Sequence, residues 1–328
     1  MKNKNYPIFI EELKNYLIGI KNLSKLYVDN IITTITQFLE FMNTYKFNEQ
    51  FESLEQITCN DIRSLSNSDI YSFIYYLADN DYKEGTRVLK LEHLRTFFDY
   101  MYRIQKNLFK EPFKEIKREK RASRQLPNYL SLNEAKKVID VYQNSTKTQD
   151  IRDTAILTIF LTSGLRLSEL QNLKMTDINF KENKFSVIGK GNKERTCYLN
   201  KMSKDALLKY LEIRKDINVI NKKDNQIVFL SHHNKRLGRN TIKQIVKRAY
   251  EKSGVDQSLY SVHTLRHTCA TILLQNGVDI KVIQEILGHS RIETTQIYTH
   301  IYNKNVEEAM LEHPLSRFKM KDALAFAM

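Results

Sequence analysis

Glycine and proline are scarce in this chain, with nine and four residues among 328. A turn-rich β fold depends on both residues, because they form the tight turns between strands. Leucine, lysine and glutamate, which suit helices, are plentiful instead, as is isoleucine. The composition therefore favours a mainly helical protein over a β-rich one.

Cysteine is rare as well, and Cys59, Cys197 and Cys269 lie far apart in the sequence. An odd number of cysteines without CxxC spacing predicts neither a disulfide framework nor a metal site. No apolar run approaches the roughly 20 residues that span a bilayer. The N-terminal segment MKNKNYPIFIEELKNYL carries acidic residues within its apolar stretch, unlike a signal peptide. We therefore expect a cytoplasmic protein with no membrane association.

Positive charge is in excess, with a net charge of +14 and a pI of about 9.4. Residues 1–113 carry a net charge of −1, residues 114–124 carry +4, and residues 125–328 carry +11. A basic excess of this size favours a polyanionic partner such as nucleic acid, although a basic protein without such a partner is equally compatible with charge alone.

The first third of the chain predicts a small helical bundle, which we place in a domain covering residues 1–113. Apolar residues at helical spacing predict helices over residues 7–19, 24–46, 68–78 and 86–104. Arg87, Lys90 and His93 recur every three residues and give the last of these helices a basic edge. This edge is a candidate DNA-binding surface, and an ordinary solvated helix face is the alternative.

A basic linker is predicted over residues 114–127, because six lysines and arginines fall within its first eleven residues. Lys117, Arg118, Lys120 and Arg121 are its candidate DNA contacts, since a basic connector can follow a phosphate backbone. The alternative is a solvated connector without a ligand. A second domain, residues 128–328, follows the linker.

The second domain is predicted to be helical with a small antiparallel sheet. Ser131 and Glu134 form a capping-box pattern at its first helix. Strands are expected over residues 184–188 and 194–199, joined by a glycine-containing turn. Helices are expected over residues 150–161, 202–214, 239–253, 263–275, 279–287 and 291–300, and apolar residues mark a further helix in the tail.

Two segments of this domain combine a glycine turn with a cation. In TSGLRLSEL, Gly164 allows a tight turn and Arg166 falls in the first turn of a helix, where the dipole disfavours a cation unless an anion is also present. Glu169, three residues on, is placed to hold the guanidinium, and a surface ion pair is the plain alternative. In GKGNKER, Lys190 lies in the turn between the two strands, a common place for an ordinary lysine.

Two further segments supply imidazoles and a hydroxyl. In SVHTLRHTCAT, His263 and Arg266 are three apart and share one helix face, whereas His267 points elsewhere and is expected to pack or to cap. In EILGHSRIETTQIYTH, His289 follows the glycine that ends one helix, and the next helix leads to Tyr298. With 18 tyrosines in the chain, a core or surface role is the default for any one of them.

Together these residue types suit a phosphoryl transfer that needs no metal. Two arginines and a histidine can stabilise the negative charge that spreads over the non-bridging oxygens in the transition state. A lysine can protonate the leaving 5′ oxygen, and a tyrosine hydroxyl can attack phosphorus to form a covalent intermediate. No carboxylate cluster suited to Mg²⁺ stands out in the sequence.

The four segments TSGLRLSEL, GKGNKER, HTLRHTCAT and LGHSRIETTQIYTH resemble, in order and spacing, the signature of the tyrosine recombinases or phage integrases. The chain is most similar to the Xer-type branch and to integrases of mobile elements. The resemblance is strong over residues 125–302 and weak in the helical N-terminal region, which looks like the family's core-binding domain. It implies a two-domain protein, mainly α with a small antiparallel β-sheet in the catalytic domain.

The resemblance also implies a role for each matching residue. Arg166 and Arg266 would bind the scissile phosphate, His289 would hydrogen-bond it, and Glu169 would support the first arginine. Tyr298 would form the 3′-phosphotyrosyl link.

Two further roles concern protons. The resemblance implies that Lys190 acts as the general acid and that His263 assists proton transfer at the nucleophile. It implies no cofactor, metal or ATP, because the covalent link conserves the phosphodiester energy.

The expected partners are a double-stranded DNA recombination site and three further protomers, either identical chains in a homotetramer or related recombinases. The tail helix is expected to dock on a neighbouring protomer or on its own domain. Alternatives are a type IB topoisomerase-like enzyme and a non-enzymatic DNA-binding protein. The LGH and YTH segments disfavour the first, and the complete set of six catalytic positions disfavours the second.

Overall fold

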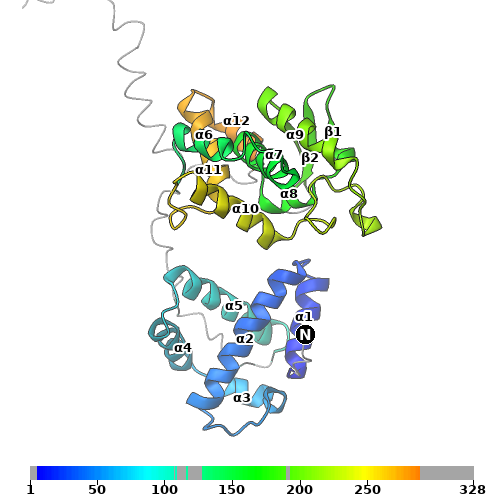
Figure 1. Ribbon diagram of the computed structural model, residues 1–328. Coiled ribbons are helices and arrows are strands. Elements are labelled where there is room, and N and C mark those ends of the chain that lie inside the picture. Colours follow the sequence, from blue (N-terminus) through cyan, green and yellow to red (C-terminus); the bar gives the residue numbers. More distant parts are fainter. Residues whose placement is uncertain (1–5, 107, 109–115, 117–127, 190–192, 289–328) are drawn as a thin grey trace, which may run out of the picture. The chain divides into compact units, whose positions relative to one another are not determined.

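The computed structural model of the protein describes residues 6–106, 108, 116, 128–189 and 193–288. The chain divides into two compact units, Met1–Arg124 and Gln125–Met328, each of which is described here by itself (Figure 1). Within the described ranges, no helix combines the length and the apolar character that crossing a membrane requires.

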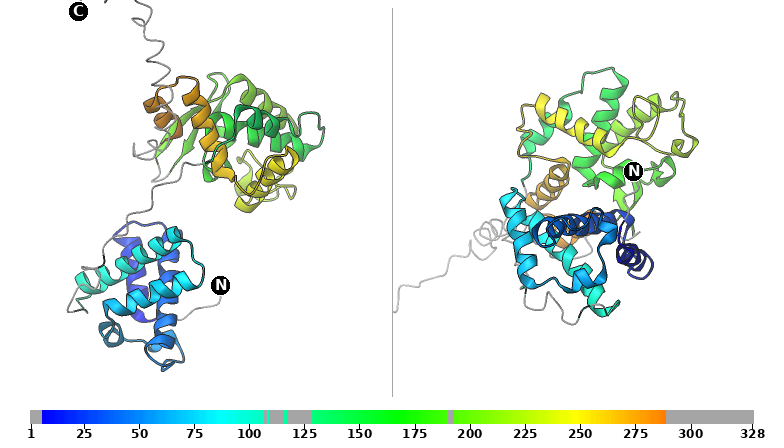
Figure 2. Two further views of the ribbon diagram at one scale, coloured as in Figure 1. Left: turned by 90° about the vertical axis from the view of Figure 1, so that its left-hand side faces the viewer. Right: turned by 90° about the horizontal axis from the view of Figure 1, so that it is seen from below.

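The first unit is a helical bundle built around one long helix. Its helices are α1 (Ile8–Gly19), α2 (Lys25–Tyr45), α3 (Cys59–Arg63), α4 (Asn67–Asp79) and α5 (Glu84–Arg103). The long α2 contacts α1, α4 and α5, as Figure 2 also shows. Phe38 of α2 lies at the centre, where its ring meets the edges of Phe73 and Phe98 at centroid distances of 5.2 and 5.8 Å. The four predicted helices are confirmed to within two residues, while the short α3 was not predicted.

The start of α2 follows from a local signal in the sequence. Ser24 is extended and its hydroxyl accepts a hydrogen bond from the Tyr27 backbone N–H, as an N-cap residue does for the otherwise unpaired amides of a first turn. The apolar residues of α2 then face inward, because they recur at helical spacing. Capping and periodicity together predict this helix.

The predicted basic edge of α5 is wrong at one of its three residues. His93 is buried, only 2% exposed, and its Nδ1 lies 2.8 Å from the Thr34 hydroxyl. Each step of three residues turns a helix by about 300°, so His93 lies roughly 120° around from Arg87. Burial, followed by the charge of Lys90, lowers the pKa of His93. The position therefore belongs to the core and not to a basic face.

The second unit packs its helices around α7 (Figure 1). Its helices are α6 (Leu132–Asp140), α7 (Thr148–Ser163), α8 (Leu167–Asn172), α9 (Lys201–Arg214), α10 (Arg239–Lys252), α11 (Val262–Gln275) and α12 (Ile280–Leu287). The apolar α7 contacts α6, α9 and α11 and is buried over most of its length. This agrees with its sequence, which is hydrophobic on nearly every side.

A three-stranded antiparallel sheet lies at one side of the second unit, in the order β1 (Ile178–Asn179), β2 (Lys184–Ile188) and β3 (Glu194–Tyr198). Phe185 pairs with Cys197 and Val187 with Arg195, so these four side chains share one face. The strands β2 and β3 confirm the predicted pair, and β1 is an unpredicted third strand. The predicted fold class, mainly α with a small antiparallel sheet, is confirmed.

Several predicted segments lie outside the described residues. These are most of the linker 114–127, the turn 190–192, the helix 291–300 and the tail helix. The remaining predicted helices of the second unit are confirmed, each within about two residues of the observed ends. The predicted roles of the two domains remain predictions.

Candidate functional site

The turn between α7 and α8 places Arg166. Gly164 ends α7 in the left-handed region, with φ of +57°, and a Cβ there would stand 2.6 Å from Cδ2 of Leu287. The chain therefore requires glycine for both its backbone conformation and the close approach of α12. Arg166 is the N-cap residue of α8, one position before the predicted first turn.

Glu169 holds Arg166 as predicted, but the pair is not a surface ion pair. The Glu169 side chain is 1% exposed, and its Oε1 accepts a hydrogen bond of 2.7 Å from Nη1 of Arg166. Its Oε2 accepts from the Arg166 backbone N–H and from Nη2 of Arg195, each at 2.8 Å. Burial alone would raise the pKa of Glu169, but the Arg195 charge and the bonds from both arginines outweigh it and lower the pKa.

Three arginines from different elements meet at the C-terminal end of α12. Arg195 Nη1 donates to the carbonyl of Ile286, Arg266 Nη2 to that of Leu287 at 2.5 Å, and Arg166 Nη2 to that of Gly288 at 3.0 Å. Cations are favourable at this end of a helix, where the last carbonyls lack intrahelical donors. Arg266, which is 6% exposed, also donates to the Gly164 carbonyl at 2.6 Å. The helix end thus fixes Arg166 and Arg266 relative to each other.

The turn that carries Lys190 begins beside Arg166. A Cβ built on Gly189 would lie 3.4 Å from Oε1 of Glu169 and 3.5 Å from Nη1 of Arg166. The Gly189 N–H donates to the Lys193 carbonyl across the turn at 2.8 Å. Lys190 itself lies outside the described residues. The structure therefore brings Gly189, the residue before Lys190, to the arginine cluster.

His263 faces the same cluster from α11, a helix capped by Ser261. Its pKa is lowered, first by partial burial and then by the charges of Arg266, Lys243 and Arg166. These four residues come from α10, α11 and the α7–α8 turn, so cationic groups gather around the imidazole. Positive charge of this density creates a potential that attracts an anion.

His267, the neighbouring imidazole, behaves as predicted. It is half-buried, and burial followed by the charges of His263 and Arg266 lowers its pKa to about 4. Its half-buried side chain is compatible with the expectation from the sequence that it packs or caps.

Sequence reasoning did not single out two groups at this site, Arg195 and Lys243. Side chains two residues apart in a strand point to the same face, so Arg195 lies on the same face as the buried Cys197. This alternation could have indicated from the sequence that Arg195 points inward. Lys243 shares an exposed face of α10 with Arg239 and Lys247 at spacings of four residues, a basic stripe that the sequence also displays.

The remaining predicted residues fall into two groups. His289, Tyr298, Lys117, Arg118, Lys120 and Arg121 lie outside the described residues. Arg87 and Lys90 are partly exposed on α5 of the first unit. Nζ of Lys90 donates to Oε1 of Gln37 at 2.5 Å and lies 5.1 Å from the centre of the Tyr82 ring, and burial lowers its pKa.

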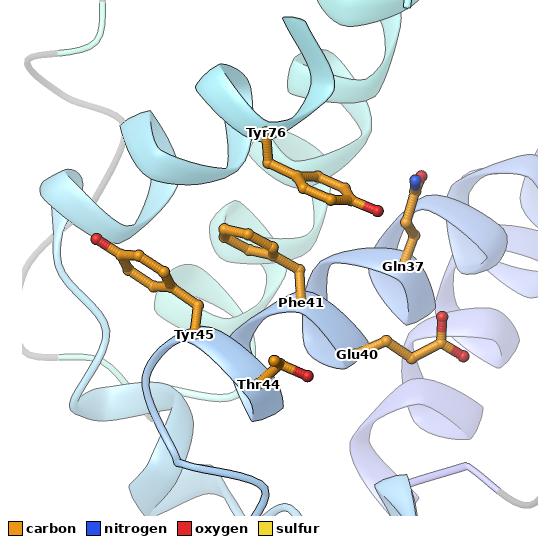
Figure 3. A pocket seen from close by; sticks show the side chains of 6 residues that line it. All are labelled: Gln37, Glu40, Phe41, Thr44, Tyr45 and Tyr76. Atoms are coloured by element: carbon orange, nitrogen blue, oxygen red, sulfur yellow. The ribbon is translucent and has the colours of Figure 1, made fainter. Parts of the chain in front are cut away.

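The first unit also carries an aromatic pocket, and one of its lining residues, Gln37, accepts the hydrogen bond from the predicted DNA contact Lys90 (Figure 3). Its volume is about 490 Å³, and its lining residues are Gln37, Glu40, Phe41, Thr44, Tyr45 and Tyr76. The Phe41 ring stacks on Tyr45 at 5.1 Å and tilts against Tyr76 at 4.7 Å. The pocket lacks the cations that a phosphodiester requires, so the arginine cluster is the better candidate for chemistry.

Comparison with known proteins identifies the family. A sequence profile of the phage integrase family matches residues 128–305. The tyrosine recombinase XerC of Caldanaerobacter subterraneus is 35% identical over 325 residues, 97% of this chain and 90% of that protein. The tyrosine recombinase XerD of Listeria innocua is 32% identical over 306 residues, 93% of this chain and 98% of that protein.

A solved structure shows the same fold. A post-cleavage complex of the XerH site-specific recombinase, bound to its palindromic difH substrate, matches with a TM-score of 0.69 and 22% identity over 95% of this chain and 98% of that one. The chain belongs to the phage integrase family and, within it, to the Xer-type tyrosine recombinases.

Proposed function

We propose that this chain cuts and rejoins DNA at a specific site through a 3′-phosphotyrosyl intermediate, in chromosome-dimer resolution or in integration and excision of a mobile element. The observation that carries the proposal is the meeting of Arg166 and Arg266 at the end of α12, with His263 near enough for both charges to lower its pKa. The turn leading to Lys190 starts at this cluster, and His289 directly follows the helix end. The two arginines that would bind the phosphate are thus held together, and the sequence leads directly from this cluster to Lys190 and to His289.

The two arginines are proposed to bind the non-bridging oxygens of the scissile phosphate. Both guanidinium groups are fixed by carbonyl oxygens of α12, and Arg166 also by Glu169. Donors held in place before the reaction need no reorganisation when charge develops on the phosphate. His289 is proposed to add a hydrogen bond to the same oxygens.

The proposed cleavage step moves one proton at each end. The Tyr298 hydroxyl oxygen attacks phosphorus while its proton passes to His263. The bond from phosphorus to the 5′ oxygen breaks, and Lys190 protonates that oxygen. Burial, followed by the charges of Arg266, Lys243 and Arg166, lowers the pKa of His263, which favours the neutral imidazole that can accept a proton.

DNA binding is proposed to use basic groups outside the cluster. In the catalytic unit, Arg239, Lys243 and Lys247 line one exposed face of α10, and Lys243 is close enough to His263 to lower its pKa. In the first unit and the linker, the candidates are Arg87, Lys90, Lys117, Arg118, Lys120 and Arg121. Such groups displace counterions from the DNA phosphates, so the affinity for DNA is expected to fall steeply as the salt concentration rises.

The proposed assembly is a homotetramer on DNA, since exchanging two pairs of strands requires four nucleophiles. The proposed location is the cytoplasm, where chromosomal and mobile-element DNA is accessible in a bacterial cell.

A covalent-capture assay tests the proposed function. Duplexes spanning the DNA on either side of the gene, nicked at successive positions to trap the intermediate, are mixed with wild-type protein or with Tyr298→Phe and run on denaturing gels. We expect a protein-linked band with strands labelled at the 5′ end, for the wild type only. A linked band with strands labelled at the 3′ end contradicts the proposed polarity. Relaxation of supercoiled plasmid without strand exchange favours a topoisomerase, and site-specific binding without cleavage favours a non-enzymatic role.

A further inference from the structure

Arg195 connects three parts of the catalytic unit that are distant in sequence. From β3 it donates to Oε2 of Glu169 at 2.8 Å and to the carbonyl of Ile286, and its Nη1 lies 2.9 Å from Sγ of Cys197. Its side chain is 10% exposed. A buried arginine with this many fixed contacts is not a solvated surface charge.

The contacts require the planar fork of an arginine. Nη1 and Nη2 reach two acceptors on different elements at the same time, which a single lysine ammonium on a flexible stem reproduces poorly. Gly288 leaves room for this fork, because a Cβ at that position would stand 2.9 Å from Nε of Arg195. The glycine at the end of α12 and the arginine on β3 therefore fit each other.

Glu169 links this arginine to the predicted phosphate site. One carboxylate oxygen binds Arg195, and the other binds Nη1 of Arg166. Both arginines also bind neighbouring carbonyls of α12, those of Ile286 and Gly288. The four groups form a closed ring in which a change at Arg195 is transmitted to Arg166 through the carboxylate and through the helix end.

We propose that Arg195 is a positioning residue for strand cleavage, which holds Glu169 and the end of α12 so that the Arg166 guanidinium meets the scissile phosphate. The proposal rests on the proposed function, in which Arg166 binds that phosphate. Arg195 itself touches only protein groups among the described residues and is not proposed to contact DNA.

The test compares Arg195→Gln with wild type, with Arg166→Ala and with the matched control Lys184→Gln. Lys184 is an exposed cation on β2, in the same sheet, and forms an ion pair with Glu182 at the surface. DNA affinity and the first-order rate of covalent-complex formation are measured separately at the mapped cut site. We expect Arg195→Gln to bind with unchanged affinity and to cleave roughly 10- to 100-fold more slowly, because a misplaced group costs rate rather than binding. Lys184→Gln is expected to match the wild type.

A methylphosphonate at the cut site separates positioning of Arg166 from a general structural defect. This group replaces a charged non-bridging oxygen by a methyl, so a guanidinium that neutralises the phosphate becomes less necessary. The rate ratio of wild type to Arg195→Gln is expected to shrink several-fold, in parallel with the ratio for Arg166→Ala. An equal ratio on both substrates, or full activity on the phosphodiester, overturns the proposal. If the glutamine variant does not fold, Arg195→Lys takes its place, with a smaller defect and the same contrast.

Hydrogen exchange on the DNA-free protein tests the role of Arg195 even if no flanking DNA is cut. Failure to cut DNA counts against the proposed function, whereas the exchange result counts for or against the positioning role. We expect Arg195→Gln to speed exchange in peptides from α8 and from the last turn of α12, and to leave α9 unchanged. Wild-type exchange at both places overturns the proposal, since Arg195 then holds neither Glu169 nor the helix end.

Discussion

Replacing Glu169 by glutamine should be among the most destabilising single-atom changes in the catalytic unit. The substitution exchanges one carboxylate oxygen for an amide nitrogen and removes the negative charge. The carboxylate is 1% exposed and lies between two guanidinium groups, those of Arg166 and Arg195. The amide nitrogen is a donor, so it would face an arginine N–H where the carboxylate oxygen had accepted a hydrogen bond. Both arginines would also lose their counter-charge.

The size of the effect follows from the burial of the three groups. Removing one partner of a fully buried ion pair costs about 3 to 5 kcal/mol. Arg195 is 10% exposed but Arg166 is 27% exposed, and water screens the latter. We therefore expect a loss at the lower end of this range, about 3 kcal/mol of unfolding free energy. A loss of this size lowers the melting temperature of a unit of this size by roughly 6 to 12 °C.

The effect should also depend on pH with a definite sign. The folded-state pKa of Glu169 lies below its ordinary value. Its charge therefore stabilises the fold fully above the unfolded-state pKa, and this stability is lost as pH falls through the folded-state pKa. The difference between wild type and Glu169→Gln should be largest near pH 7 and shrink in acid.

Native-state hydrogen exchange of the central helix α7 is the suitable assay, because it reports the opening of the catalytic unit separately from the first unit. The matched control is Glu182→Gln, the same change in an exposed ion pair with Lys184, for which we expect no measurable loss of stability because water screens the pair. A loss below about 1 kcal/mol for Glu169→Gln would refute the view that a buried, charge-dependent network holds Arg166.

Three further outcomes are expected. Lys190→Ala should block cleavage of normal DNA but much less so with a 5′-phosphorothiolate, whose leaving sulfur needs no proton; an equal loss on both substrates removes the general-acid role. The folded-state pKa of His267 is about 4, so protonation favours the unfolded chain and the unfolding free energy should fall by about 2 kcal/mol between pH 7.5 and pH 5. His267→Gln should lack this part of the pH dependence in urea unfolding. The same pH dependence in the variant and the wild type would contradict this prediction. Gly164→Ala should cost about 1 to 3 kcal/mol more than Gly254→Ala in thermal unfolding, since both have positive φ but only Gly164 would clash with Leu287; equal losses would mean that strain alone matters.

Features of the fold that depend on nearby residues were predictable from the sequence. Ser24 starts α2 and apolar periodicity carries it onward, while glycines between two alternating segments gave β2 and β3. Spacing placed His263 and Arg266 on one helix face, and the charge of Arg266 does act on His263. Each of these inferences needed only the geometry of one helix or one hairpin.

The assembly of the site depends on contacts that no local pattern contains. Arg166 and Gly288 are 122 residues apart, and Arg195 and Ile286 are 91 apart. The sequence motifs gave the residue types but not the helix end on which three arginines converge. Burial of Glu169 was missed for the same reason, since Arg195 of β3 and the turn at Gly189 approach it only in the tertiary structure.

The identity of the nucleophile is the central claim, and the most direct measurement is to find the residue that carries the DNA. Covalent complex trapped on nicked flanking DNA is digested with nuclease and trypsin, and the peptide with residual nucleotide is sequenced by mass spectrometry. We predict the nucleotide on Tyr298. Its presence on another residue, such as Tyr302, would contradict the assignment.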